Sequence, residues 1–180
     1  DYFLRAPSVA DGCPVFWRGK LSAPPGKRER AAVRLEWMKD VVDYVGGYFD
    51  FPAVNVPTYL SDDLESLDAD SLQGIAADIR SHWGIRPGPF PDVLEKLEAN
   101  GILVSRIHVG AEKLDAFSQW SDRFSLPFVV LGRDKASAVR QRFDALHELA
   151  HIVLHRNVSH KRLNDRAYYN LIERQTKTLD

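Results

Sequence analysis

Apolar residues recur at intervals of three and four in five stretches of the chain, and this period predicts amphipathic α-helices. Glycine closely follows three of these stretches, as is usual at helix C-termini. For the second helix we expect Asp70 or Ser71 as the N-cap, because a short polar side chain can accept a hydrogen bond from the first turn. Pro91 suits the first turn of the third helix. The expected helices cover about residues 28–45, 71–83, 91–99, 137–155 and 165–179.

Between the third and fourth helices the pattern changes to short segments rich in β-branched and aromatic residues. These segments predict strands at residues 102–107, 116–120 and 127–131. Three short strands at this spacing favour a small antiparallel sheet. The predicted fold class is therefore α+β, mostly helical, with a three-stranded antiparallel sheet packed against the helix at 137–155.

Proline and glycine punctuate the remaining segments. Residues 1–27 are expected to form a loop, and so are residues 157–164. Residues 51–60 carry Pro52 and Pro57, which favour an extended connector. No internal repeat or low-complexity tract is visible.

Composition limits the classes of protein to consider. The 180 residues fit one domain, or a compact domain with an appendage, and 44% hydrophobic with 27% charged residues is ordinary for a globular protein. A net charge of −1 gives no overall field that attracts nucleic acid or an anionic membrane. No apolar run approaches the roughly 20 residues that span a bilayer, and the first residues lack the basic-then-apolar layout of a secretory signal, so we expect none. Cys13 is the only cysteine, which suits a reducing cytoplasm.

The segment His147-Glu148-Leu149-Ala150-His151 carries the candidate chemistry. On a helix, residues four apart lie one above the other, so His147 and His151 can bind one metal ion. Glu148 projects beside that pair, where it can hold and deprotonate a water molecule. Apolar residues flank the segment, and a mostly buried helix has little reason to carry two histidines and a glutamate without partners.

Catalytic zinc normally takes three protein ligands, so one more is needed. His155 follows on the same helix, but its direction has drifted by about 80° over eight residues, which favours a role at the helix C-terminus. Glu173 lies in the last predicted helix, which a short loop can fold back against the helix at 137–155. We expect Glu173 to be the third ligand. The candidates after His151 are His155, His160, Asp165, Glu173 and Asp180.

The stretch Arg140-Gln-Arg-Phe-Asp-Ala-Leu-His147-Glu-Leu-Ala-His151-Ile-Val-Leu-His155 resembles the signature of the ImmA/IrrE family of bacterial and phage metallopeptidases. Earlier segments are similar too: residues 75–84, 88–91 and 97–104, and the strand at 127–131. The resemblance covers about residues 70–180. Two departures stand out: Ala150 replaces the usual glycine, and the sequence after Glu173 lacks the family's alanine-rich pattern.

This resemblance implies a zinc-dependent, gluzincin-like endopeptidase, in which manganese or iron are further possible metals. His147, His151 and Glu173 would be the metal ligands and Glu148 the general base. Family members typically cleave or inactivate a helix-turn-helix repressor, which switches on a stress, phage or mobile-element response. Many carry a helix-turn-helix module on the same chain.

Residues 1–69 are accordingly expected to be a connector with one helix that follows such a module, and residues 70–180 the peptidase domain, truncated at its C-terminus. The chain begins at Asp1 rather than Met, so we expect it to be a piece of a longer protein. Any DNA contact would be made by the missing module, and no membrane contact is expected.

Two functions remain open at this stage. The first is cleavage of a regulatory protein in the cytoplasm, with an extended substrate docked on an edge of the sheet. The second is a non-catalytic, metal-binding transcriptional regulator or antitoxin-like module that acts by binding another protein. The sequence leaves the partner, the activating signal and the oligomeric state open.

Overall fold

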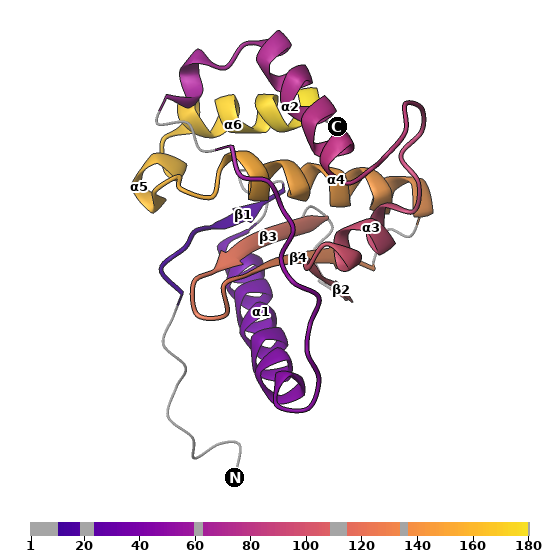
Figure 1. Ribbon diagram of the computed structural model, residues 1–180. Helices are drawn as coiled ribbons and strands as arrows, with labels where there is room; N and C mark the ends of the chain where they lie inside the picture. The colour runs from indigo at the N-terminus through magenta and orange to yellow at the C-terminus, as the bar shows by residue number, and fades with distance from the viewer. Residues whose placement is uncertain (1–10, 19–23, 60–62, 109–114, 134–136, 180) are drawn as a thin grey trace.

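The computed structural model describes residues 11–18, 24–59, 63–108, 115–133 and 137–179. The fold is α+β: after β1 a run of helices comes first, three strands follow, and a second run of helices ends the described chain (Figure 1). In chain order the elements are β1 (Val15–Trp17), α1 (Pro25–Gly46), the 3₁₀ helix η2 (Leu64–Ser66), α2 (Ala69–His82), α3 (Val93–Ala99), β2 (Leu103–Ile107), β3 (Ala116–Ser121), β4 (Leu126–Gly132), α4 (Ala138–Leu154), α5 (His160–Leu163) and α6 (Arg166–Leu179).

The sheet has four strands in the order β1-β3-β4-β2. β3 pairs antiparallel with β1 and β4, whereas β2 pairs parallel with β4. The expected sheet of three antiparallel strands was therefore wrong in number and in direction. A strand of three residues is too short to show a period of two, which is why β1 was expected to be loop. β3 pairs with β4 on the side away from β2, so β2 is the neighbour of β4 and not of β3. The two neighbours run in the same direction, and their pairing is therefore parallel.

The helices follow the expected pattern closely, with differences at their ends. Asp68, not Asp70 or Ser71, caps α2 by accepting a hydrogen bond from the Ser71 amide. Asp92 caps α3, so Pro91 precedes that helix rather than lying in its first turn. The expected loop at 157–164 contains the short helix α5.

Residues 51–59 form no helix or strand, as expected, and run against the end of α3. Asn55 donates two hydrogen bonds to Asn100, one from its backbone amide and one from Nδ2, and its carbonyl accepts one from Trp83 Nε1 at 2.8 Å. Gly101, at φ 78°, lies directly against this segment: a Cβ there would be 2.7 Å from the carbonyl oxygen of Ala53. Only glycine fits both the backbone angle and the space.

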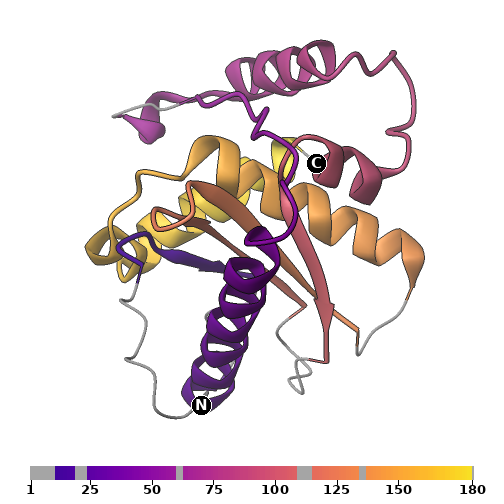
Figure 2. The same cartoon turned by 60° about the horizontal axis from the view of Figure 1, so that its bottom comes forward.

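The sheet is covered on both faces, with α1 on one and α4 on the other (Figures 1 and 2). Neighbouring strand residues point to opposite faces, so each strand contributes to two cores. Phe117, Phe128 and Val130 pack against α1, whereas Ala116, Val129 and Leu131 belong to the core that contains α4. β1 and α1 thus pack on the same sheet as the motif helix, with α1 on the face opposite α4. The expected domain boundary at residue 69 remains a prediction.

Lys39 of α1 is buried, with 1% of its side chain exposed, and forms ion pairs with Asp11 and Glu36. Burial raises the pKa of Asp11, but hydrogen bonds from Lys39, the Arg123 amide and Ser121 outweigh it and leave that pKa below its usual value. These contacts tie the segment before β1 to α1 and to the turn after β3.

Asp11→Ala is expected to lower the free energy of unfolding by about 3 kcal/mol, near the lower end for a broken buried ion pair because Glu36 still contacts Lys39. Because the folded-state pKa is lowered, the stabilisation is present above pH 4 and is lost as the pH falls below it. Urea unfolding at pH 7 and pH 3 measures both effects. Asp43→Ala, which removes an exposed ion pair with Arg123, is the control and should change stability by less than about 1 kcal/mol. Equal effects of the two variants would contradict the buried-pair argument.

Candidate metal centre and active site

α4 places His147 and His151 on the same side of the helix, one turn apart. Their ring centroids are 5.0 Å apart, and the rings meet edge to face. Both side chains are fully buried, with 1% and 0% of the residue surface exposed. The helix is buried on several sides because the sheet covers one flank while α2, α3 and α6 cover others (Figure 1).

α6 brings Glu173 to the two imidazoles. One carboxylate oxygen is 3.5 Å from His147 Nε2 and the other is 3.4 Å from His151 Nε2. Burial raises the pKa of Glu173, whereas the two imidazoles, when their Nε2 atoms carry protons, donate hydrogen bonds to the carboxylate and lower that pKa far below its usual value. One atom from each of the three residues lies within 4.8 Å of the others, which is a suitable grouping for one metal ion.

The donor set fits zinc, which binds imidazole nitrogen and carboxylate oxygen. A buried polar atom normally has a hydrogen-bond partner. Among the described residues, Oε1 of Glu173 and Oε1 of Glu148 are buried and have none. A cation with a water molecule beside it would satisfy both oxygens.

Glu148 lies between α4 and the sheet, with none of its surface exposed. Burial raises its pKa to about 8, against the opposing effects of His147 and of a hydrogen bond from Ser118. Ser118 Oγ donates that bond to Oε2 at 2.6 Å, which orients the carboxylate. Sequence reasoning missed Ser118. The available signal was a serine at an inward position of β3, alternating with Ala116 and Trp120.

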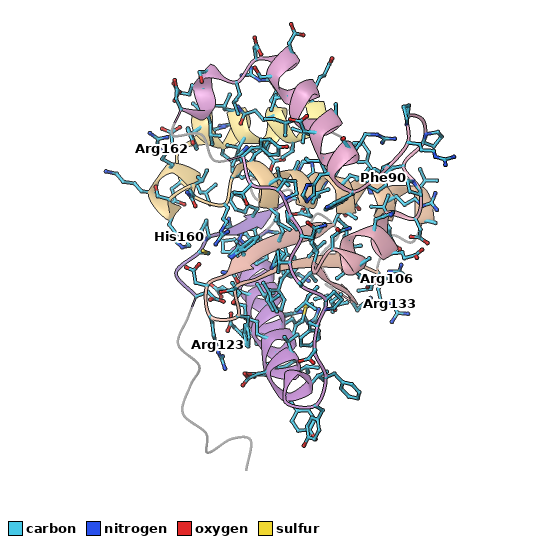
Figure 3. All side chains as sticks on the ribbon, viewed as in Figure 1. Phe90, Arg106, Arg123, Arg133, His160 and Arg162 are labelled. Carbon is cyan, nitrogen blue, oxygen red and sulfur yellow. The ribbon has the colours of Figure 1, made fainter. Side chains whose placement is uncertain are left out.

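The remaining candidates for the third ligand lie elsewhere. His160 of α5 is exposed at the side of the molecule, and its Nε2 contacts the carbonyl of Gly12 at 3.3 Å (Figure 3). Asp165 caps α6 through the amide of Tyr168. Asp180 is outside the described residues. His155 stands behind His151, with the two Nδ1 atoms 3.0 Å apart.

His155 belongs to a chain of hydrogen bonds that ends on His151. Gln175 Nε2 donates to the carbonyl of Leu64 at 2.6 Å, which fixes the orientation of the amide. Its Oε1 must then accept from Nε2 of His155, 3.1 Å away. Burial lowers the pKa of His155 to about 3, so the ring is neutral and its Nδ1 accepts from Nδ1 of His151. The lone pair of His151 therefore lies on Nε2, the atom that faces Glu173.

Gln175→Leu is expected to weaken zinc affinity by about 10- to 100-fold, the usual effect of losing a group that orients a metal-binding histidine. Competition with a chromogenic chelator measures the affinity, and circular dichroism of the metal-free protein checks the fold. The control is Thr178→Val on the same helix, which removes an exposed hydroxyl that bonds only to the Arg174 carbonyl. Unchanged affinity in folded Gln175→Leu would contradict the orienting role.

Two histidines one turn apart, with a glutamate from a later helix, form the ligand set of catalytic zinc in thermolysin-type peptidases. The Peptidase M78 family model, described as an IrrE N-terminal-like domain, matches residues 97–178, from α3 to α6. This match confirms the resemblance between the segment and the ImmA/IrrE family of metallopeptidases that was found in the sequence. No curated protein and no solved structure matches the chain.

Proposed function

We propose that the chain is a zinc-dependent endopeptidase that cleaves a regulatory protein, in which His147, His151 and Glu173 hold the metal and Glu148 is the general base. The observation that carries this proposal is the convergence of the three ligand atoms within 4.8 Å, next to a buried glutamate. The family match supports a peptidase. Manganese or iron would bind a similar ligand set, so the identity of the metal as zinc is also part of the proposal.

The bound metal would supply a Lewis acid that polarises the scissile carbonyl and lowers the pKa of water to about 7. The residues of the chain do the rest. Glu148 takes a proton from the attacking water and passes it to the leaving amine. Ser118 keeps the carboxylate of Glu148 directed at the metal side, and the Gln175–His155 pair keeps the lone pair of His151 on Nε2.

The proposed substrate is a helix-turn-helix repressor, and the proposed outcome is the switching on of a stress, phage or mobile-element response in the cytoplasm. This part rests on the family resemblance. Among the described residues no helix is both long and apolar enough to cross a membrane.

The test is to incubate the full-length protein with zinc and a small repressor encoded next to it. A single scission, seen by mass spectrometry and blocked by a chelator, is the expected result. Tight binding without scission would instead favour a non-catalytic regulatory module. That alternative has one observation in its favour: the motif residues are buried, since His147, Glu148 and His151 are each at most 1% exposed, and of the proposed ligands only Glu173 reaches the surface, with 19% of its side chain exposed.

A further inference from the structure

β1 lies between the edge of the sheet and α6. On one side it pairs antiparallel with β3, with Phe16 opposite Ser118, the residue that orients Glu148. The Arg18 amide donates to the carbonyl of Ala116 at 3.1 Å, so in an antiparallel ladder Phe16 also bonds to β3 and the carbonyl of Trp17 points away from it. That carbonyl accepts a hydrogen bond from Tyr169 of α6 at 2.7 Å.

Two side chains, one in β1 and one directly after it, face α4 and flank the proposed metal ligands. Phe16 stacks on the ring of His151, with centroids 4.7 Å apart and planes 15° from parallel. Arg18, two residues on and therefore on the same face, pairs with Asp144 at 2.6 Å, one turn before Glu148. Trp17, between them, points to the other face and packs against Phe117.

This placement leaves β3 without a free edge beside the site in the described structure. A peptidase of this type must bring an extended peptide alongside the metal, and β3 is the strand that would bind it by edge pairing. That edge is taken by β1 over residues 15–17, and the outer side of β1 is taken by α6. The exposure of at most 1% for the three motif residues is the result.

We propose that β1 occupies the substrate position of its own active site and holds the enzyme closed until it is displaced. This inference rests on the proposed peptidase function and adds its regulation and its substrate class. The substrate is an extended segment that pairs antiparallel with β3 and places an aromatic side chain over His151, as Phe16 does. A partner or an upstream part of the protein that pulls on the segment before β1 would open the site.

The test measures binding rather than cleavage, so it does not depend on catalysis. The protein carries Glu148→Gln and is loaded with zinc. The probe is a fluorescein-labelled peptide with the sequence of residues 11–18, serine replacing Cys13, and binding is followed by anisotropy. In Phe16→Ser/Arg18→Ser, which removes both inward contacts, affinity for the peptide is expected to rise at least about tenfold, because the binding-competent fraction rises. Phe124→Ser is the control. It removes a partly buried aromatic ring at the turn after β3, and this variant should bind the peptide as the parent does.

A crosslink decides the question if the double variant does not fold. Val15 and Gln119 face each other across the β1–β3 pair at a site without ladder hydrogen bonds, where Cα atoms are about 4.5 Å apart and a disulfide fits. Val15→Cys/Gln119→Cys in a Cys13→Ser background is measured oxidised and after reduction with a phosphine. The expected result is no peptide binding when oxidised and recovery on reduction.

Peptide binding by the oxidised protein at the affinity of the reduced one would overturn the proposal, because β1 would then be a permanent strand and the substrate site would lie elsewhere. Zinc content, determined on the same samples, reports separately on the metal site. If the protein lost zinc but peptide binding still depended on reduction of the crosslink, the peptidase would be rejected. β1 would remain the strand that occupies the edge of β3.

Discussion

Glu148→Gln is expected to reduce cleavage of the protein substrate by about 10²- to 10⁴-fold, the usual contribution of a general base, while zinc stays bound. The physical reason is that glutamine keeps the size of glutamate but cannot accept a proton from water. The hydrogen bond from Ser118 can persist, because the amide oxygen still accepts it. Burial is unchanged, and because burial disfavours the charged form of Glu148 and raises its pKa, we expect a neutral amide to be accommodated at this position.

Single-turnover cleavage assays and zinc analysis of the same preparations test this expectation. The matched control is Glu95→Gln on the exposed surface of α3, which changes the same group away from the site and should leave the rate unaltered. Retained cleavage in zinc-loaded Glu148→Gln would assign the base to another residue. Loss of zinc together with activity would show that Glu148 supports the ligands rather than the proton transfer.

The sequence predicted the helices well because each buries a stripe of apolar residues, and such a stripe leaves a period in the sequence whatever its partner is. It also indicated Glu173, since a metal motif with two ligands requires a third and the last helix carried a suitable carboxylate. Both inferences depend on local spacing and on general chemistry.

What escaped sequence reasoning depends on pairing between distant segments. β1 has three residues and acquires its identity only from β3, about a hundred positions away. β2 pairs with β4, its neighbour in space, and not with β3, its neighbour in sequence, and its pairing is therefore parallel rather than antiparallel. Ser118 and Gln175 are ordinary polar residues until the fold places one on Glu148 and the other between His155 and Leu64.

Glu173→Ala is expected to weaken zinc affinity by more than about 100-fold, beyond the effect of losing an orienting group, because one of the three proposed protein ligands is removed. The remaining pair, His147 and His151, comes from a single helix and offers no charge to offset the cation. The loss of affinity should be greatest near neutral pH. At lower pH protons compete with the metal for the imidazole nitrogens, which weakens binding in the parent protein as well.

Chelator competition on the metal-free protein gives the affinity, and thermal unfolding with and without zinc gives an independent measure, since a ligand that binds only the folded state raises its stability. Arg174→Ala, at the neighbouring exposed position of α6, is the control and should retain both the affinity and the zinc-induced shift. Glu173→Gln separates charge from shape, because it keeps an oxygen at the same place and should recover only part of the affinity. Full affinity in Glu173→Ala would remove this residue from the ligand set, and with it the link between α6 and the metal on which the proposed hydrolase depends.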